Sequence, residues 1–156
     1  MNKNKIKTNY YYASLLLDDY AGVISEDSAS HLYIFQHIIL KNTNKKLSDC
    51  LLRISIKEMQ HLSILGDLII QLGGIPFFKT YSHINKKIIP WNADFINYEL
   101  DEIKILELNI ESEKNAILQY KKHISLIHDV HIKETLEKII LDEEEHIKIF
   151  ESFLLK

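Results

Sequence analysis

The chain has one cysteine, Cys50, and one arginine, Arg53, among its 156 residues. A single thiol cannot form an internal disulfide, which favours a reducing, cytoplasmic setting. It also argues against an iron–sulfur or zinc-ribbon module within these residues, because such modules need several cysteines. With a net charge of -3, the chain shows no basic excess of the kind that nucleic-acid binding requires.

Long uninterrupted apolar runs are also missing. The longest early run, Leu15-Leu16-Leu17, ends at Asp18 and is too short for an export signal or a membrane span. The composition, 46% hydrophobic and 26% charged, is ordinary for a globular protein and argues against disorder. We therefore expect one domain over residues 1–156, with an N-terminal tail at 1–13 and no contact with a membrane.

Glycine and proline are scarce, with four and two residues, so little interrupts a helical pattern. Apolar residues recur every three or four positions in four long segments that we expect to be helices. These segments cover about residues 14–40, 47–72, 95–127 and 132–155. Short turns join the first two and the last two, which predicts two antiparallel helix pairs and an all-α four-helix bundle.

The connection between the two pairs is much longer than either turn. Gly73 and Gly74, followed by Pro76, are typical of a helix stop, and we assign residues 73–94 to a crossover segment. A long crossover lets the third helix start at the far end of the bundle. We expect this segment to pack along the bundle because it is too apolar for an exposed loop. Its apolar residues are Phe77, Phe78, Tyr81, Ile88, Ile89 and Trp91.

Each half of the chain carries the pattern Glu-x-x-Ala-x-x-x-Tyr and then Glu-x-x-His. The two glutamates are 32 residues apart in the first half and 30 in the second. The repeated residues are Glu26, Ala29, Tyr33, Glu58 and His61, and then Glu113, Ala116, Tyr120, Glu143 and His146. Four carboxylates and two imidazoles, divided evenly between related halves, are the donors that two metal ions at a pseudo-twofold axis require.

The repeated glutamates fall within the apolar faces of the expected helices. Ile54, Glu58, His61 and Leu65, for example, advance by three or four residues along one stripe. Four buried carboxylates would repel one another or take up protons, at a cost of several kcal/mol each. Two divalent cations remove this conflict, and the Glu-x-x-His spacing places both donors on one helix face. Glutamates of neighbouring helices can then bridge ions about 3.5–4 Å apart.

The same periodicity chooses between neighbouring acids. Glu111 shares a polar face with other charged residues, so we expect it in solvent and Glu113 in the site. Glu144 and Glu145 likewise fall on outer faces, which leaves Glu143 as the buried acid of the last helix. His123 fits no ligand spacing.

These residues resemble the ferritin-like superfamily, particularly its bacterioferritin and rubrerythrin branches, over about residues 20–155. The resemblance implies a ferritin-like four-helix bundle with a dinuclear metal site. The matching metal ligands are Glu26, Glu58, His61, Glu113, Glu143 and His146. Tyr33 matches the tyrosine found beside these ligands, and Tyr120 is its counterpart in the internal repeat. Each tyrosine could orient a ligand carboxylate or donate an electron, or simply pack in the core.

The chain also departs from both branches. Bacterioferritins continue into a short fifth helix, whereas this chain ends ten residues after His146, so we do not expect a storage shell of the usual kind. Rubrerythrins generally carry a rubredoxin domain, which is missing here, so an external electron donor is expected. Met59 sits where bacterioferritins place a haem-ligating methionine, but we expect it to pack in the core without haem.

The pattern and the resemblance together indicate a di-iron oxidoreductase of the ferroxidase or peroxidase type, acting on dioxygen or hydrogen peroxide. A dimanganese catalase is a rival hypothesis, because residues 58–74 also resemble manganese catalases and both metals accept these donors. Two further hypotheses are an iron-binding or storage protein without a large cage, and a helical scaffold without metal. A homodimer is expected, since related folds associate through helix faces.

Overall fold

The computed structural model describes residues 6–81 and 87–155. Predictions that concern residues 1–5, 82–86 and 156, which include parts of the tail and the crossover, lie outside these described residues. The helices are α1 (Tyr10–Ala21), α2 (Glu26–Leu40), α3 (Lys45–Gln71), α4 (Glu102–Leu126) and α5 (Val130–Leu154). Two short strands, β1 (Lys79–Tyr81) and β2 (Ile88–Pro90), and a 3₁₀ helix, η1 (Ala93–Phe95), lie between α3 and α4.

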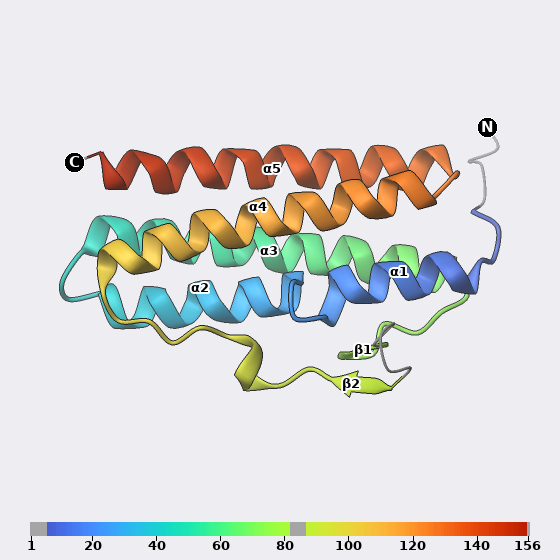
Figure 1. Ribbon diagram of the computed structural model, residues 1–156, viewed down its shortest axis with the longest axis horizontal. Coiled ribbons are helices and arrows are strands. Elements are labelled where there is room, and N and C mark those ends of the chain that lie inside the picture. Colours follow the sequence, from blue (N-terminus) through green and yellow to red (C-terminus); the bar gives the residue numbers. More distant parts are fainter. Residues whose placement is uncertain (1–5, 82–86, 156) are drawn as a thin grey trace.

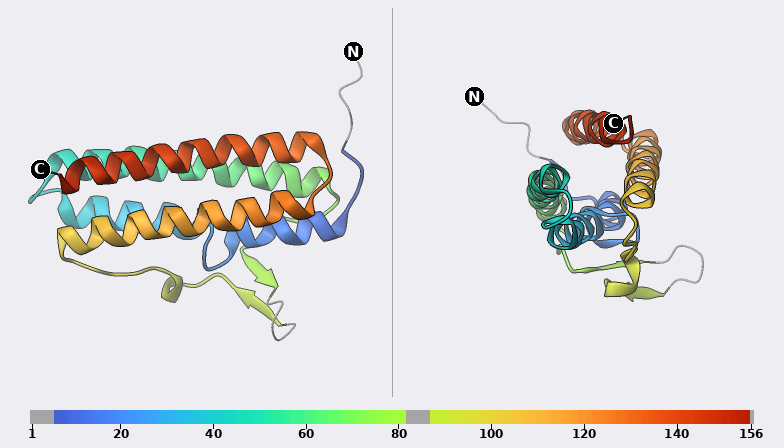
Figure 2. Two further views of the ribbon diagram at one scale, coloured as in Figure 1. Left: turned by 45° about the horizontal axis from the view of Figure 1, so that its top comes forward. Right: turned by 90° about the vertical axis from the view of Figure 1, so that its left-hand side faces the viewer.

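The helices form a four-helix bundle in which α1 and α2 together make one of the four rods (Figure 1). α2 packs chiefly on α3, and α4 packs chiefly on α5, as the end-on view shows (Figure 2). Both pairs are antiparallel, and the crossover runs the length of the bundle between them. The predicted all-α fold, with two helix pairs and a long crossover, is therefore confirmed. None of the helices that the structure describes is long and apolar enough to cross a membrane.

The first predicted helix, residues 14–40, is wrong in one respect, because the structure divides it at residues 22–25. Gly22 ends α1 with its N–H donating to Asp18 O at 3.0 Å, and a Cβ on Gly22 would lie 2.6 Å from that oxygen. Ser25 then caps α2 by accepting a hydrogen bond from Ser28 N at 3.2 Å. Val23 lies in this break and is 57% exposed.

The other helix ends differ from the prediction by local capping. α1 begins at Tyr10, inside the predicted tail, because Asn9 accepts a hydrogen bond from Tyr12 N at 3.0 Å. α4 begins at Glu102 rather than near residue 95, where Asp101 caps it by accepting from Lys104 N at 3.0 Å.

The crossover segment lies along α1 and α2 (Figure 1). Its strands pair antiparallel with Thr80 opposite Ile89. Trp91 donates through Nε1 to Ser28 Oγ at 3.0 Å, and the ring of Phe78 lies 5.3 Å from that of Tyr20. The expected packing is therefore present at these two aromatic residues. It is incomplete, however, because Phe77, Phe78 and Ile88 remain between 46% and 62% exposed. The side chain of Tyr81 lies outside the described part of the structure.

A polar layer divides the apolar core in two. On α3, Leu51 and Ile54 belong to one apolar cluster, and Leu65 and Leu68 belong to the other. On α5 the same change occurs between Ile139 in one cluster and Phe150 in the other. Fully burying one such side chain contributes about 1.5–3 kcal/mol, so the two clusters stabilise the bundle on either side of the polar layer. The repeated glutamates and histidines occupy that layer.

Candidate metal centre

The structure brings all six predicted ligands into the polar layer. Glu26 is the first residue of α2, Glu58 and His61 lie on α3, Glu113 lies on α4, and Glu143 and His146 lie on α5. Each is at most 5% exposed. By contrast, Glu111, Glu144 and Glu145 are exposed, so the periodicity distinguished the buried acids from their neighbours correctly.

The donor atoms form two groups that could each hold a metal ion, and within each group they lie within 4.8 Å of one another. One group is Glu26, Glu58, His61 and Glu143, and the other is Glu58, Glu113, Glu143 and His146. Glu58 and Glu143 belong to both groups, which places them to bridge two ions. Glu26 and Glu113 belong to one group each and would be terminal ligands. This division follows the internal repeat.

The nitrogen atoms that face the centre are each surrounded by three carboxylates. His61 Nδ1 lies 2.9 Å from Glu58 Oε2, 3.1 Å from Glu143 Oε1 and 3.5 Å from Glu26 Oε2. His146 Nδ1 lies 2.9 Å from Glu143 Oε2, 3.0 Å from Glu58 Oε1 and 3.5 Å from Glu113 Oε1.

One N–H cannot satisfy three acceptors, and two buried oxygens, Glu58 Oε1 and Glu143 Oε1, have no hydrogen bond in the described structure. An unsatisfied buried carboxylate oxygen is costly. A cation at each converging point would satisfy these oxygens together with the imidazole nitrogens. Buried oxygen and nitrogen donors are suitable for divalent iron or manganese, so the residues fit a pair of such ions.

The protonation of the centre without metal shows the same conflict. Burial, together with the charges of Glu143 and Glu58, raises the pKa of Glu26 and Glu113 well above the usual range. Burial by itself would lower the pKa of His146, but hydrogen bonds to Glu113, Glu143 and Glu58 outweigh it and raise the value to about 12. The centre therefore holds protons where it would otherwise hold cations.

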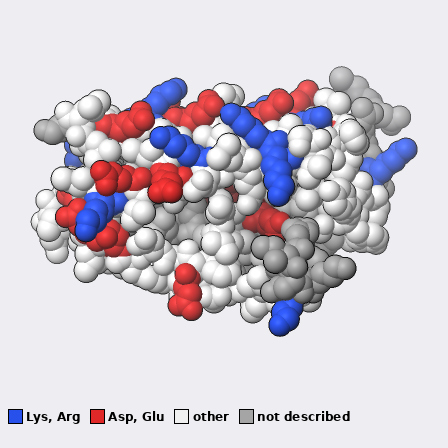
Figure 3. Space-filling model, viewed as in Figure 1, with Lys and Arg blue, Asp and Glu red and all other residues white. Residues whose placement is uncertain are grey.

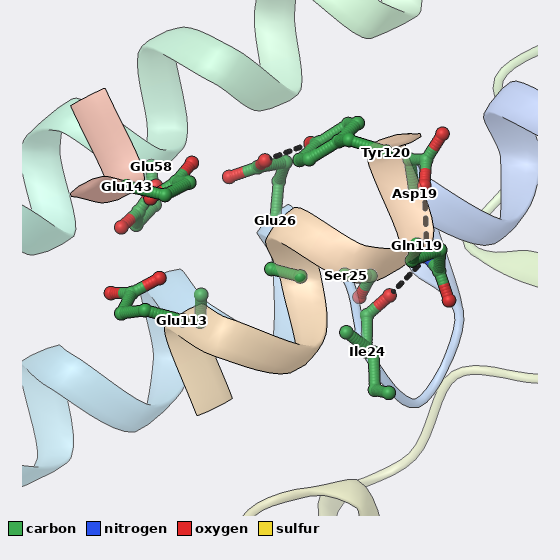
Figure 4. A pocket seen from close by; sticks show the side chains of 11 residues that line it. Asp19, Ile24, Ser25, Glu26, Glu58, Glu113, Gln119, Tyr120 and Glu143 are labelled. Atoms are coloured by element: carbon green, nitrogen blue, oxygen red, sulfur yellow. Dashed lines mark hydrogen bonds between the residues drawn. The ribbon is translucent and has the colours of Figure 1, made fainter. Parts of the chain in front are cut away.

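Tyr33 and Tyr120 each bond to a ligand from the opposite half of the chain. Tyr33 Oη donates to Glu113 Oε1 at 2.5 Å. Figure 4 shows the second bond, in which Tyr120 Oη donates to Glu26 Oε1. Burial and the neighbouring carboxylates raise the pKa of both phenols, so both keep the proton that they donate. The arrangement suits the predicted orienting role, which remains a prediction.

Asp142 contacts His61 from outside the centre, and the sequence pattern did not indicate it. Its Oδ2 accepts a hydrogen bond from His61 Nε2 at 3.0 Å and lies 3.4 Å from Lys57 Nζ. In a neutral imidazole this contact would hold the proton on Nε2, so that Nδ1 could bind an ion. Asp142 immediately precedes Glu143, and Lys57 immediately precedes Glu58. The residue before the shared glutamate is therefore positively charged in the first half of the repeat and negatively charged in the second.

A second buried pair that the sequence did not reveal lies beside Tyr120. Asp19 is 1% exposed, and its Oδ2 lies 2.7 Å from His123 Nδ1. Its Oδ1 accepts from Gln119 Nε2 at 2.8 Å, and the same nitrogen donates to Ile24 O at 2.9 Å. Burial raises the pKa of Asp19 despite these partners. This network joins α1, the break after it, and α4.

Met59 does not pack in the core as predicted. It is 49% exposed, because it follows Glu58 directly and so points about 100° away from the inward face of α3. Its surroundings include Trp91 of the crossover and Leu62 of α3.

A family model described as Rubrerythrin matches residues 20–154, which is most of the chain. The chain belongs to the rubrerythrin family. The assignment agrees with a di-metal carboxylate fold, and the two groups of buried glutamates and histidines could each hold an ion.

Members of this fold similar to the chain include two longer proteins named as catalases. A protein named "Probable manganese catalase" from Clostridium acetobutylicum is 26% identical, with 96% of this chain and 73% of the relative covered. The structure of KatB, a manganese catalase from Anabaena PCC7120, superposes with a TM-score of 0.87 at 27% identity, covering 99% of this chain and 75% of KatB.

Bacterioferritin supplies a third comparison, at the level of the fold. The bacterioferritin of Desulfovibrio desulfuricans has a TM-score of 0.73 at 22% identity, with 92% of this chain and 78% of that chain covered. This likeness supports the ferritin-like bundle, in agreement with the resemblance drawn from the sequence.

Proposed function

We propose that this rubrerythrin-family protein is an oxidoreductase that consumes hydrogen peroxide at a dinuclear metal centre. The observation that carries the proposal is the pair of four-residue donor groups that share Glu58 and Glu143. The shared glutamates would bridge the ions, with Glu26 and His61 completing one site and Glu113 and His146 the other. The bound ions would supply two-electron redox chemistry at a position shielded from bulk water.

The side chains around this centre hold and position protons. Tyr33 and Tyr120 fix Glu113 and Glu26 by hydrogen bonds, so each terminal carboxylate presents a defined oxygen toward the centre. Asp142 orients the imidazole of His61 in the same manner. The apolar clusters on both sides exclude water, which strengthens these electrostatic interactions.

Manganese is the first candidate for the metal, because the two relatives that match nearly the whole chain are named as manganese catalases. Iron is the second candidate, because the sequence analysis predicts a di-iron centre. The two metals would lead to different reactions. A dimanganese catalase converts two molecules of hydrogen peroxide into one dioxygen and two waters without any other reductant. A di-iron peroxidase reduces hydrogen peroxide to water with electrons from an external donor and releases no dioxygen.

The first experiment measures iron, manganese and zinc per chain, and then dioxygen release from hydrogen peroxide by manganese-loaded and iron-loaded protein. Dioxygen release without a donor supports the catalase reaction, whereas donor-dependent loss of peroxide supports the peroxidase. A protein that binds neither metal after reconstitution contradicts the proposal.

A matched pair of variants on α5 tests the site. Glu143→Gln removes a shared ligand charge and should reduce turnover by about a hundredfold or more with loss of bound metal. Glu144→Gln, one residue further on the exposed face, should leave both unchanged. Equal behaviour of the two variants would show that the ligand assignment is wrong.

A further inference from the structure

Two cavities lead from the break between α1 and α2 to the glutamates of the centre. The smaller one has a volume of about 20 Å³. Ile24, Ser25 and Gln119 line it near the surface, and Figure 4 shows Ile24 and Gln119 on the side away from Glu58, Glu113 and Glu143. The same cavity is lined by all four glutamates, namely Glu26, Glu58, Glu113 and Glu143. Partly exposed residues are thus connected to the buried centre.

The second cavity has a volume of about 100 Å³ and lies beside the first. It begins at Val23 and Ser112, which are exposed, and reaches Tyr33 and Glu113. The centre can therefore be approached from two directions, both of which start between α2 and α4. This side of the bundle is less closely packed because α2 contacts mainly α3, and α4 contacts mainly α5.

Ala29 and Ala116 line both cavities. Each follows a terminal glutamate, Glu26 or Glu113, by three residues, which places the methyl group on the helix face that carries the carboxylate. Both alanines are only partly buried, so no other side chain covers them completely. A longer side chain at either position would project into the space in front of the glutamates. Metal binding by itself does not explain why an alanine belongs to the internal repeat, whereas a role in keeping these cavities open does.

We propose that Ala29 and Ala116 set the width of the substrate passage and limit the centre to molecules as small as hydrogen peroxide. This inference rests on the proposed function, whose substrate class it narrows. A volume of about 10–15 Å³ accommodates one water molecule, so the smaller cavity has room for little more. The wider cavity reaches only Glu113 of the four glutamates, so the narrow space in front of the other three would exclude alkyl hydroperoxides that carry a branched hydrocarbon group.

The surrounding polar groups suit a peroxide in this passage. The Ser25 hydroxyl already donates to Gly22 O and accepts from Ser28 N, and Gln119 has an amide whose Nε2 already donates to Asp19 and Ile24 O. The Gln119 carboxamide oxygen can accept a hydrogen bond from an entering O–H group. The passage therefore combines apolar walls at the two alanines with polar atoms at its outer end.

The test substitutes Ala116 by leucine and uses azide, a small linear anion, as a probe of the metal-loaded centre. Azide binding is followed by its optical absorption change, and turnover is measured with hydrogen peroxide and with tert-butyl hydroperoxide. We expect Ala116→Leu to retain its metal content and to lower the azide association rate and peroxide turnover by about tenfold or more. The wild-type protein should turn over tert-butyl hydroperoxide far more slowly than hydrogen peroxide.

Lys114→Leu is the matched control, because it adds the same side chain to an exposed position of α4 two residues away. It should leave azide association unchanged. Ala116→Gly provides a variant that needs no extra space in the core, and it should increase the rate with tert-butyl hydroperoxide. If the glycine variant gains no such activity and the leucine variant binds azide as fast as wild type, the proposal is wrong. A wild-type protein without peroxide turnover would refute the proposed function, while the azide rates would still decide on the passage.

Discussion

Asp142 makes the two proposed metal-binding groups unequal. It accepts a hydrogen bond from His61 Nε2 at 3.0 Å, whereas Lys57, a cation, occupies the corresponding place before Glu58 in the other half. A carboxylate that bonds to the outer nitrogen of a ligand histidine fixes the ring and makes it a stronger donor. The group that contains His61 should therefore bind its ion more tightly than the group that contains His146.

Replacing this carboxylate should affect one ion more than the other. Asp142→Asn should weaken binding of the tighter ion by about 10–100-fold, because the amide is a poorer acceptor for the imidazole N–H. Stepwise titration of metal-free protein with Mn²⁺ in a calorimeter measures both constants. Glu144→Gln on the exposed face is the control. Equal weakening of both ions would show that Asp142 acts on the whole fold rather than on His61.

For single residues, helical periodicity predicts which side chains face the core. It does not predict which side chains contact a residue of the other helix pair. Glu113 was separated from Glu111 because two residues change the face of a helix by about 200°. Asp142 lies on an outer face of α5 and contacts His61 of α3, so no pattern within α5 indicates it. Asp19 and His123 are 104 residues apart and become a pair only through the packing of α1 on α4.

Among the elements, the break between α1 and α2 matters most for the centre. Ser25 caps α2 so that Glu26, its first residue, faces the ligands of α3 and α5. The partial positive charge of a helix N-terminus also favours a carboxylate at this position. The sequence did not predict the break because one glycine is tolerated within a helical pattern, and the apolar periodicity continues on both sides of it.

A pair of glycine substitutions tests how closely this break is packed. Gly22→Ala should lower the free energy of unfolding by about 1–3 kcal/mol, since its Cβ would lie 2.6 Å from Asp18 O. Gly66→Ala in α3 should be neutral or raise it by about 0.5–1 kcal/mol, because its Cβ meets only Tyr20 and Pro76 at 3.5 and 3.9 Å. Urea denaturation followed by circular dichroism measures both. A Gly22 variant as stable as wild type would mean that the turn adjusts without cost.

For the whole molecule, the metal-free and metal-loaded states should respond to pH in opposite ways. In the metal-free protein, burial and like charges raise the pKa of Glu26 and Glu113, and carboxylate partners raise that of His146 to about 12. Groups whose pKa rises on folding stabilise the fold at low pH. That contribution is lost as the pH rises from about 4.5 for the glutamates and from about 6.5 for the histidine.

We therefore expect the melting temperature of the metal-free protein to fall between about pH 5 and pH 9. Metal binding displaces these protons, so the apparent affinity for Mn²⁺ should rise over the same range. Thermal melts with metal and with a chelator, at matched ionic strength, show whether the two curves diverge. Parallel curves would contradict the proposed exchange of protons for cations.

Charged side chains on the surface should contribute little to this pH dependence. Acidic and basic side chains are interspersed on the face of the molecule in Figure 3. The exposed charged residues of α4 include Glu111, Lys114 and Lys121. Exposed charges of mixed sign contribute little to stability individually. The pH response should therefore originate mainly in the buried layer. A homodimer remains a prediction, which sedimentation of the metal-loaded protein would check.

Neither helix pair supplies all four residues of a candidate metal-binding group by itself. The group of Glu26, Glu58 and His61 takes Glu143 from the second half, and the group of Glu113, Glu143 and His146 takes Glu58 from the first. The tyrosines cross in the same way, from Tyr33 to Glu113 and from Tyr120 to Glu26. Two bound ions would thus act as cross-links between two helical hairpins that otherwise pack mainly within themselves. The supply of metal would then determine how firmly the halves of the protein are joined, as well as whether the centre reacts.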